Sequence, residues 1–441
     1  MIRKIVFGVL ALVMVALPSV AQYGGNLSSF SDRSGDRVQY ISNQNSYGGD
    51  IHAFWLNGTQ PVDTDATTWY SAMGSEWALF GSLTSFSDGN GQHSFYIGGP
   101  DFHIHQLYWS WSTSSGSDLD WTKLAGAPMA FSNNGLTGFS NSRGQHAYYT
   151  EWPWNGHIHH LYAVGAAKPI DEDLTVKAGP GPTCANPNGA LTSFSDGSTE
   201  LVYYIGPSGH ICELAGWPQT SWVWNSWLRR WVQVTVWKES SFDLTALSGG
   251  TPAMLFSPLT GYSDANGQNV FYLDPNHHIY QLHLSRSGTW SNPDLTAQFG
   301  GGNPAQAASL TAFSVCAAQV AAACAWEELV SYLDNSNNVN LITIPLGLHQ
   351  VIYPALWDAG AMPMNTGACQ FGTSLASISS DVSGGADVYY IGSDQHVYKI
   401  HAYPGELDFR YFVYPWADQT ITYNGVAAGQ QGSPLGWCLI G

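Results

Sequence analysis

The sequence predicts an all-β chain folded as a seven-bladed β-propeller, with three to four antiparallel strands in each blade. Three observations carry this prediction. A motif of the form Leu-Thr-Ser-Phe-Ser-Asp recurs seven times, each repeat holds further β-type runs at matching offsets, and turn residues separate the runs. A fixed period built from short strands is typical of a propeller or solenoid. We therefore expect a ring of similar modules rather than one catalytic centre.

The recurring motif marks the first strand of each repeat. Its copies begin at Leu27, Leu83, Leu136, Leu191, Leu259, Leu310 and Leu375. Successive starts are separated by 56, 53, 55, 68, 51 and 65 residues. A β-helix needs shorter repeats, and a row of separate sandwich domains needs about 100 residues in each unit. The spacing therefore favours the blades of a propeller.

Each repeat also carries a second and a third run. The second is aromatic and β-branched, as in Val-Tyr-Tyr-Ile at 202–205, and such side chains fit a pleated surface. The third alternates polar and apolar residues, as in His-Ile-His-Gln-Leu-Tyr at 103–108, which indicates a strand with one buried face. A weaker fourth element often ends in Asp-Leu-Thr, as at 173–175 and 243–245. Clusters of Gly, Asp, Asn, Ser and Pro between the runs predict turns.

Both ends of the chain carry expected features of their own. Residues 1–21 have the basic start, apolar run and small-residue cleavage site of a secretory signal peptide, with cleavage after Ala21. We therefore expect residues 22–441 to form the mature propeller, secreted or periplasmic. Residues 433–441 echo an opening strand and are expected to close the ring, because free sheet edges promote aggregation. An unrelated C-terminal strand is the alternative.

The composition excludes some classes of partner. The chain has 14 Lys and Arg against 32 Asp and Glu, a net charge of −18. A nucleic-acid binder needs a basic surface, so nucleic acid is excluded as a partner, and membrane insertion is not expected. Charged residues make up 10% of the chain, while there are 48 Gly, 19 Trp and 23 Tyr. This combination favours an exported all-β binding protein without a cofactor.

Six cysteines in an exported chain suggest disulfide bonds. Cys316 and Cys324 flank an Ala-rich insertion in the sixth repeat, where a hairpin would bring them together. Cys369 and Cys438 could pin the last blade shut, and that pairing would leave Cys184 with Cys212. The sequence leaves the connectivity open.

Recurrent histidines are the first candidates for chemistry. His103 with His105, and His157 with His159, are two residues apart on a strand, so each pair shares one face. Imidazoles so placed can bind a metal. No carboxylate lies at a complementary sequence spacing, so we predict no metal site. We interpret the histidine after the turn as part of the blade consensus, bonded to the loop backbone.

Tryptophans are the second candidates. The fourth repeat is the longest because of a Trp-rich insertion at 216–240. We expect a long β-hairpin there that contacts a partner or a second subunit, since large exposed aromatic patches usually mark binding surfaces. Most other tryptophans are expected to fill gaps between blades. Exposed indoles can also stack on sugar rings.

The sequence contains few patterns that would indicate catalysis. The chain has no Gly-x-Ser-x-Gly elbow, no His-Glu-x-x-His motif and no P-loop. Glycosidases need a carboxylate pair at a defined separation, and the acidic residues here are scattered along the chain. We therefore expect no enzyme, and a glycosidase or lyase acting at the central channel is the third alternative.

One run carries a family resemblance. Residues 201–214 read Leu-Val-Tyr-Tyr-Ile-Gly-Pro-Ser-Gly-His-Ile-Cys-Glu-Leu. They resemble the repeat of the fucose-specific lectin-like β-propellers, with its Val-x-Tyr and Gly-x-Ile-x-Glu-Leu pattern, and the seven degenerate repeats resemble the bacterial relatives. Similar runs cover essentially the whole mature chain. The resemblance implies sugars in clefts between adjacent blades, held by an Arg on the second strand, a Glu on the third and a stacked aromatic ring.

The resemblance also implies candidate binding residues. The position of the Glu holds Glu213 in the fourth repeat and Gln106, His160 and Gln281 in three others, whereas the position of the Arg is matched by Arg37 in the first. No repeat keeps both residues, so each site would bind weakly and gain by multivalency. The candidates for the aromatic ring are Trp217, which would form the best-preserved cleft with Glu213, together with Trp109 and Trp121.

The leading hypothesis is an exported, non-catalytic carbohydrate-binding propeller whose partners are glycans or glycoconjugates, with a homo-oligomer left open. The alternative is a structural or adhesion scaffold that binds protein partners through the insertion at 216–240.

Overall fold

A computed structural model describes residues 27–42, 48–57, 60–70, 77–130, 135–151, 156–165, 167–178, 190–225, 229–255, 257–264, 266–299, 310–320, 323–334, 339–346, 357–358, 375–380, 385–391, 397–402 and 417–420. The expected signal peptide at 1–21 and the expected closure strand at 433–441 lie outside these ranges. No helix among the described residues is long and apolar enough to cross a membrane.

The described strands form seven antiparallel sheets, numbered here in chain order. The first four sheets are β1 Leu27–Asp32, β2 Gly35–Ile41, β4 Ile51–Asn57 and β5 Gln60–Asp65; β3 Gly48–Gly49, β6 Ala78–Ser87, β7 Gly91–Gly98, β8 Ile104–Ser110 and β9 Ser115–Asp120; β10 Leu136–Asn141, β11 Gly144–Thr150, β12 Ile158–Ala163 and β13 Ile170–Asp173; β14 Leu191–Ser195, β15 Glu200–Ile205, β16 Ile211–Asn225 and β17 Arg230–Asp243.

The remaining three sheets follow the same order. They are β18 Leu259–Ser263, β19 Gly267–Leu273, β20 Ile279–Ser285 and β21 Trp290–Ser291; β22 Leu310–Val320, β23 Ala323–Leu333, β24 Val339–Leu346 and β25 Trp357–Asp358; β26 Leu375–Ser380, β27 Gly385–Ile391, β28 Val397–Ala402 and β29 Ala417–Thr420. Within the described ranges, five short helices lie between strands: α1 Ala66–Tyr70, α2 Trp121–Ala125, α3 Leu174–Lys177, α4 Leu244–Ser248 and α5 Leu295–Phe299.

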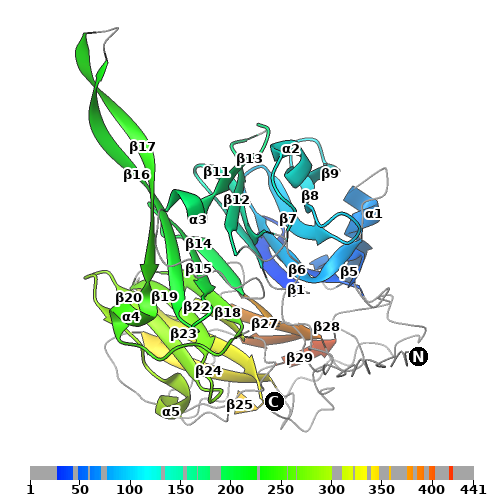
Figure 1. The fold of residues 1–441 in the computed structure, drawn as a ribbon. Coiled ribbons are helices and arrows are strands. Elements are labelled where there is room, and N and C mark those ends of the chain that lie inside the picture. Colours follow the sequence, from blue (N-terminus) through cyan, green and yellow to red (C-terminus); the bar gives the residue numbers. More distant parts are fainter. Residues whose placement is uncertain are drawn as a thin grey trace, which may run out of the picture.

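The sheets are arranged around a common centre, which confirms the predicted all-β propeller architecture (Figure 1). The motif that opens each repeat forms the innermost strand. Each such strand contacts the corresponding strand of the next sheet, and β26 contacts β1. Ser29 donates from its Oγ to the carbonyl of Ser377, 3.1 Å away, so the first and seventh sheets are joined directly.

The second strand of the fourth sheet, β15, is deeply buried. All six residues of β15 are buried, because this strand lies in the middle of its sheet and the sheet packs against a neighbour on either side. The aromatic run that the sequence predicted as a strand therefore fills the spaces between sheets. Tyr203, for example, packs in a cluster shared by the fourth and fifth sheets.

The Asp-Leu-Thr element is more than the end of a strand. Asp243 ends β17, and its carboxylate then accepts a hydrogen bond from the backbone N–H of Ala246, 2.9 Å away, so it caps α4. Thr245 accepts from the backbone N–H of Ile211 at 2.8 Å. Short polar side chains favour this capping geometry. The element therefore joins the fourth strand to the third through a single helical turn.

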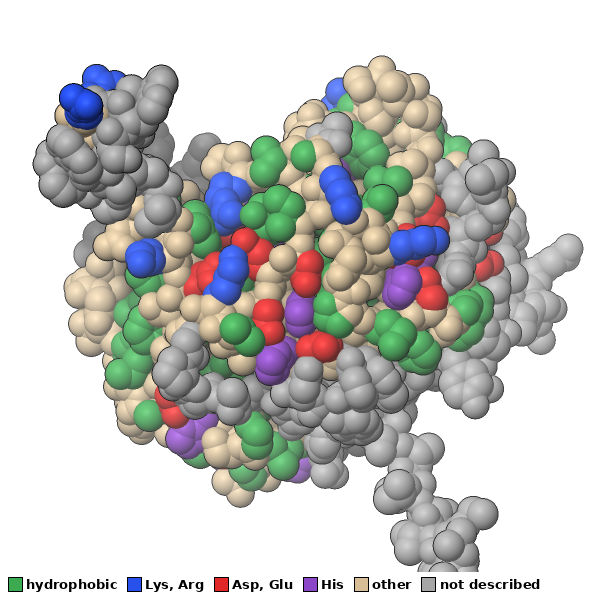
Figure 2. Space-filling view, turned by 45° about the horizontal axis from the view of Figure 1, so that its top comes forward, with side chains coloured by type: hydrophobic (Ala, Val, Ile, Leu, Met, Phe, Trp, Pro, Cys, Tyr) green, Lys and Arg blue, Asp and Glu red, His purple; other side chains and the backbone are tan. Residues whose placement is uncertain are grey.

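The recurrent histidine after the turn has a different partner from the expected loop backbone. His210 Nδ1 lies 2.7 Å from the carboxylate of Asp243, which is the helix cap. The same pair recurs in three other sheets, as His103 with Asp120, His157 with Asp173 and His278 with Asp294. The expected structural role is kept, but it is exerted through a carboxylate. Figure 2 shows histidine and acidic side chains lying side by side on one face of the molecule.

The Trp-rich insertion forms the long hairpin that the sequence predicted. Strands β16 and β17 pair from Cys212 with Asp243 out to Asn225 with Arg230. The hairpin extends well beyond the other strands of its sheet and projects from the ring (Figure 1). At its tip Arg229 and Arg230 are exposed, and the side chains of 221–228 and 231–236 lie outside the described part of the structure.

The expected disulfide bonds gain no support. Cys212 is a buried thiol whose Sγ lies 3.9 Å from the carbonyl oxygen of His210. Cys316 and Cys324 do share the β22–β23 hairpin, but they lie opposite Trp326 and Gln319 rather than opposite each other. Cys184, Cys369 and Cys438 lie outside the described residues.

Candidate functional site

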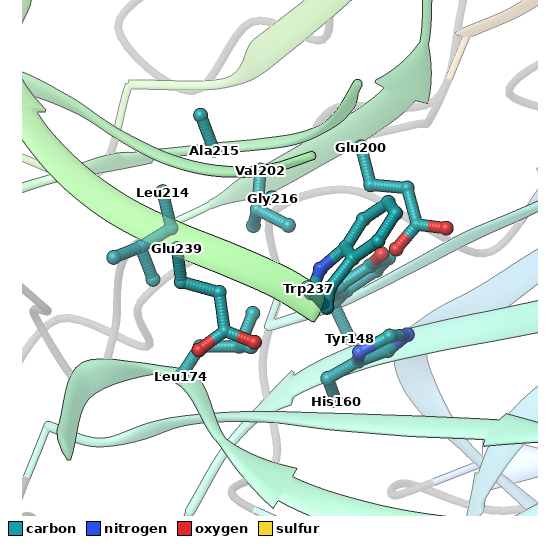
Figure 3. A pocket seen from close by; sticks show the side chains of 10 residues that line it. All are labelled: Tyr148, His160, Leu174, Glu200, Val202, Leu214, Ala215, Gly216, Trp237 and Glu239. Atoms are coloured by element: carbon teal, nitrogen blue, oxygen red, sulfur yellow. The ribbon is translucent and has the colours of Figure 1, made fainter. Parts of the chain in front are cut away.

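A pocket open to solvent lies between the third and fourth sheets (Figure 3). The free space at this place, counted together with the part that is open to solvent, is about 280 Å³. Its lining comes from β11, β12 and α3 of the third sheet and from β15, β16 and β17 of the fourth, and consists of Tyr148, His160, Leu174, Glu200, Val202, Leu214, Ala215, Gly216, Trp237 and Glu239.

Strand register explains how the fourth sheet builds its side of this pocket. Glu200 on β15 pairs with Gly216 on β16, and Gly216 pairs with Glu239 on β17. Residues directly opposite each other point to the same face of a sheet, so both carboxylates flank the glycine on the face toward the third sheet. A Cβ on Gly216 would lie 2.5 Å from Nε1 of Trp237. The glycine is therefore what allows the indole to lie across the sheet.

The third sheet supplies a cation to the same place. Asn141 ends β10, and Arg143 follows it in the turn to β11. The Arg143 guanidinium donates from Nη1 to Glu200 at 2.8 Å, and its Cζ lies 3.6 Å from the centre of the Trp237 ring. Asn141 donates from Nδ2 to the other oxygen of Glu200 at 2.9 Å. One arginine thus contacts a carboxylate and an indole of the neighbouring sheet.

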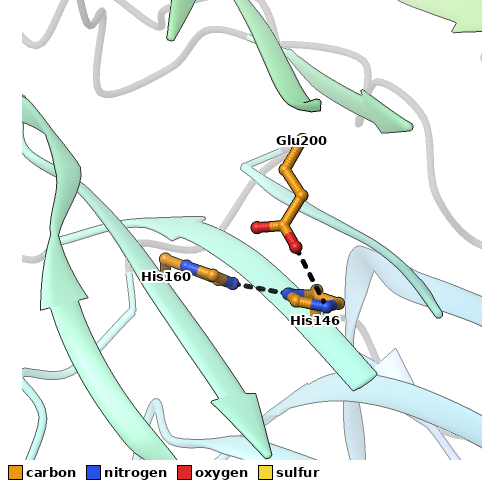
Figure 4. A group of neighbouring side chains, drawn as sticks. All are labelled: His146, His160 and Glu200. Atoms are coloured by element: carbon orange, nitrogen blue, oxygen red, sulfur yellow. Dashed lines mark hydrogen bonds and ion pairs between the residues drawn. The ribbon is translucent and has the colours of Figure 1, made fainter. Parts of the chain in front are cut away.

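Two neutral histidines lie next to Glu200: His146 contacts its carboxylate, and His160 contacts His146. Burial lowers the pKa of His146 to about 3, assisted by the charge of Arg143. Burial likewise lowers the pKa of His160 well below its usual range. His146 lies 2.8 Å from His160 and 3.4 Å from Glu200, and Figure 4 shows it between the two. Because both rings are neutral, one must donate and one accept at their contact.

The carboxyls of the pocket are held in an apolar setting. Burial raises the pKa of Glu200, although hydrogen bonds from Asn141 and Arg143 oppose the rise. Burial also raises the pKa of Glu239, and the nearby ammonium of Lys177 opposes it. The pocket therefore combines two carboxyl groups that can accept hydrogen bonds with one guanidinium and one indole.

Similar polar contacts join other neighbouring sheets. In each, a residue at or just after the end of a first strand bonds a residue at or near the start of the next sheet's second strand. The pairs are Asp32 with Gln92 at 2.6 Å, Asp88 with Gln145 at 3.4 Å, Asn141 with Glu200 at 2.9 Å and Asp196 with Gln268 at 3.1 Å. The contact between the third and fourth sheets is the one that carries an arginine and a glutamate.

A second group of cations and aromatic rings lies at the first and second sheets. The predicted candidate Arg37 bonds Asp32 at 3.0 Å and lies 4.5 Å from the centre of the Trp55 ring. Trp55 is near Trp69, which is 45% exposed and stacks on the predicted candidate Trp109, with ring centres 4.4 Å apart. The structure thus brings Arg37 and Trp109 into one continuous aromatic surface.

The other predicted binding residues lie deeper. Trp121 is 2% exposed and donates from Nε1 to Oε1 of Gln106, so neither side chain faces solvent. Gln281 is buried and donates to Glu328 at 2.8 Å. His160 is buried at the base of the pocket. In this structure these four side chains are part of the interior of the fold.

The predicted cleft of Glu213 and Trp217 is not open in the same way. Glu213 is 6% exposed, and burial raises the pKa of its carboxyl to about 7. Trp217 is partly buried against the core shared by the fourth and fifth sheets. Because the side chain is this buried, we expect a Glu213→Ala substitution to lower the stability of the fold as well.

Sequence reasoning assigned no binding role to Arg143, Glu200 or Glu239, and it included Trp237 only as part of the Trp-rich insertion at 216–240. Two signals could have found them. The chain has 14 Lys and Arg in 441 residues, so any arginine beside a turn stands out. A glycine inside a strand, as at Gly216, often marks the close approach of another group.

By sequence, the chain matches no known family and no curated protein. Several solved structures are similar in fold. The Aleuria aurantia lectin bound to Fucα1-6GlcNAc is 10% identical, with a TM-score of 0.45 over 95% of this chain and 100% of that one. The SapL1 lectin bound to α-methyl fucoside is 12% identical (TM-score 0.45, 76% and 94% covered). AofleA from Arthrobotrys oligospora is 13% identical (0.44, 77% and 87%).

Proposed function

We propose that the protein binds neutral saccharides in the pocket between the third and fourth sheets. The observation that carries this proposal is the Trp237 indole at a solvent-open pocket, with the Arg143 guanidinium and the Glu239 carboxylate beside it. Saccharides present apolar C–H faces together with hydroxyl groups. An indole offers an apolar wall for the first, and charged groups form strong hydrogen bonds with the second.

Each side chain has a distinct part in this proposal. Arg143 donates hydrogen bonds to sugar oxygens, while Glu239 accepts them from sugar hydroxyls. Glu200 positions Arg143 through the 2.8 Å ion pair. Gly216 leaves room for the ring between the two carboxylates.

The charge of the pocket supports a neutral ligand. Arg143 and Lys177 contribute two positive charges, against three carboxylates from Glu172, Glu200 and Glu239. The remaining excess is negative, and the whole chain has a net charge of −18. Sialylated or sulfated glycans would therefore be repelled.

A glycan array probed with residues 22–441 at high valency tests the proposal. We expect binding to a related set of neutral saccharides, and Arg143→Ala should weaken it about 10–100-fold, the value of one charge-assisted hydrogen bond. Trp237→Phe should weaken it as well. Arg286→Ala is the matched control, since Arg286 is exposed in the β20–β21 turn, away from the pocket. A blank array from folded protein, or equal loss in the control, would refute the proposal.

We also propose that the seven sheets are seven blades of one ring, as the sequence period predicted. Support comes from the contacts between successive first strands and from the Ser29 bond to Ser377. Of the similar structures, the Aleuria aurantia lectin has a six-bladed fold. An electron-microscopy projection down the ring axis should show seven densities, and six would refute the count.

A multivalent mode is proposed for the aromatic surface of Arg37, Trp55, Trp69 and Trp109. It offers the same kinds of group as the pocket, around one exposed indole, Trp69, and two partly buried ones. Weak sites on one ring add through effective concentration when the glycan surface is dense. Binding that rises steeply with glycan density in the wild type, and less steeply in Trp69→Ala, would support two sites.

Protein binding through the projecting hairpin is the second candidate function. The observation that favours it is the length of β16 and β17 beyond the other strands of their sheet. Replacing 219–236 by a two-residue Asn-Gly turn keeps Trp237 and removes the projection. Retained glycan binding in this variant would assign the hairpin to another partner, and lost binding would assign it to the glycan.

Two further expectations remain proposals. We propose that no chemistry follows binding, which mass spectrometry of the bound oligosaccharide after long incubation would test. We also propose export with cleavage after Ala21, which N-terminal sequencing of the mature protein would test.

A further inference from the structure

Two neighbouring sheets carry the same group of five ligand-type residues at the start of the third strand. In the third sheet the group is Glu151, His157, His159, Asp171 and Asp173. In the second sheet it is Asp101, His103, His105, Asp118 and Asp120. The strand register is the same in both, because His159 lies opposite Asp173 just as His105 lies opposite Asp120.

Part of each group is structural, and comparison among the sheets separates that part. The first histidine and the last aspartate form the helix-capping pair that also occurs in the fourth and fifth sheets. At the position of the second histidine, those two sheets have Cys212 and Tyr280. At the position that Asp171 and Asp118 occupy on the fourth strand, they have Ser241 and Asn292. The second histidine and its aspartate are therefore not needed to build a sheet of this kind.

Glu151, His159 and His157, the histidine of the capping pair, together have the geometry of a ligand set. His159 Nε2 lies 3.3 Å from Oε2 of Glu151, and His157 Nδ1 lies 3.9 Å from the same oxygen. One ligand atom from each of the three residues falls within 4.8 Å of the others. Two atoms that share a tetrahedral Zn²⁺ at about 2.0–2.2 Å are about 3.4 Å apart. The three side chains thus need small movements to share one ion.

The surroundings of His159 match those of a metal-bound imidazole. Its Nδ1 lies 3.0 Å from Oδ1 of Asp171, while Nε2 faces Glu151. A carboxylate that accepts the second ring N–H fixes the orientation of a ligating histidine and makes it a better donor to the metal. In the second sheet, Asp118 lies 3.5 Å from His105 Nδ1, and Asp101 lies 3.3 Å from its Nε2.

We propose that the third sheet binds one divalent transition-metal ion through Glu151, His157 and His159, and that Zn²⁺ suits this set best. Two imidazoles and one carboxylate are typical ligands of Zn²⁺, whereas Mg²⁺ and Ca²⁺ prefer oxygen ligands alone. The side chains of His157 and Glu151 are 31% and 19% exposed, so an ion and a bound water can reach them. The site lies apart from the saccharide pocket, whose lining includes none of the three residues.

The second sheet holds a weaker copy of this site. Its ligand atoms within 4.8 Å come from Asp101, His105 and Asp120, so it offers one imidazole and two carboxylates. Fewer nitrogen ligands favour Zn²⁺ less. We therefore expect two binding events of unequal affinity. The sequence singled out the paired histidines but not their carboxylates, because Asp171 and Glu151 reach His159 through strand pairing and a loop.

Calorimetric titration of tag-free mature protein, dialysed first against a chelator, tests the proposal. We expect ZnCl₂ to bind and to raise the melting temperature, while MgCl₂ does neither. His159→Gln should abolish the tighter event, and Asp171→Asn should weaken it about 10–100-fold, as for other carboxylates that orient a ligating histidine. His210→Gln is the matched control, because it removes a capping histidine from a sheet without the second histidine, and its Zn²⁺ binding should equal that of the wild type.

Melting curves in chelator establish that each variant is folded, and the visible spectrum of bound Co²⁺ supplies a readout that a structural role would not change. A tetrahedral Co²⁺ band in the wild type, absent in His159→Gln, supports the site. Absence of Zn²⁺ binding by folded wild type would overturn the proposal. Equal Zn²⁺ binding by wild type and folded His159→Gln would overturn it too.

Discussion

The buried carboxyl of Glu213 makes the stability of this protein depend on pH. Its side chain is 6% exposed, and its Oε2 has no hydrogen-bond partner among the described residues. Burial raises the pKa from 4.5 to about 7. Between these values the folded protein keeps a proton that the unfolded chain has released. The stability that this proton contributes is therefore present below pH 4.5 and lost as the pH rises through 7.

The magnitude follows from the size of the pKa shift. A shift of one unit corresponds to about 1.4 kcal/mol, so the rise of Glu213 from 4.5 to about 7 lowers the free energy of unfolding by about 3 kcal/mol across this window. Glu213→Gln keeps the size of the side chain and removes the titration. We expect the variant to be about 3 kcal/mol more stable than the wild type at pH 8, and to lose less stability between pH 5 and 7.

Urea denaturation at pH 5, 6, 7 and 8 measures this difference. Glu328 is a second case, because burial raises its pKa to about 7 as well, although Gln281 donates a hydrogen bond to it. Glu328→Gln should reduce the pH dependence in the same direction, and the double variant should reduce it further. Identical pH dependence in wild type and Glu213→Gln would mean that Glu213 is ionised in the folded protein, and the reasoning from burial would be refuted.

Two further substitutions test how the fold supports the pocket. Asp243→Ala removes the cap on the Ala246 N–H, and we expect a loss of about 1–2 kcal/mol in the free energy of unfolding, measured by urea denaturation, with an unchanged glycan profile. Gly216→Ala places a Cβ 2.5 Å from Trp237 Nε1, so we expect weaker glycan binding on the array. The control Gly89→Ala, whose new Cβ has no atom within 4 Å, should bind as the wild type does. Equal binding by both alanine variants would show that the indole is not part of the site.

The sequence by itself determined the repeat and the kind of element it contains. The motif spacing, the aromatic second runs and the alternating third runs are local patterns, and they were enough to predict strands, their order and a propeller. The long hairpin at β16 and β17 followed from the same reasoning. Such features are readable because strand formation and turn formation depend on residues near one another in the chain.

The positions of the candidate site residues could be predicted in part. Arg37 and Trp109 were singled out from the sequence, and the structure joins them through Trp55 and Trp69. Gln106 and Trp121 were singled out for the same reason, yet they bond each other in the interior. A position within a repeat predicts which face a side chain occupies, but not whether the neighbouring sheet covers it.

The tertiary structure alone decided which side chains meet between sheets. Arg143 reaches Glu200 across 57 residues of sequence, and Trp237 joins them from a strand that is later still. Glu151 and Asp171 likewise meet His159 through a loop and a strand pair. The physical reason is that a side chain's partner across a sheet interface depends on the register of two sheets and on their packing distance. Neither quantity is encoded in the residues adjacent to that side chain.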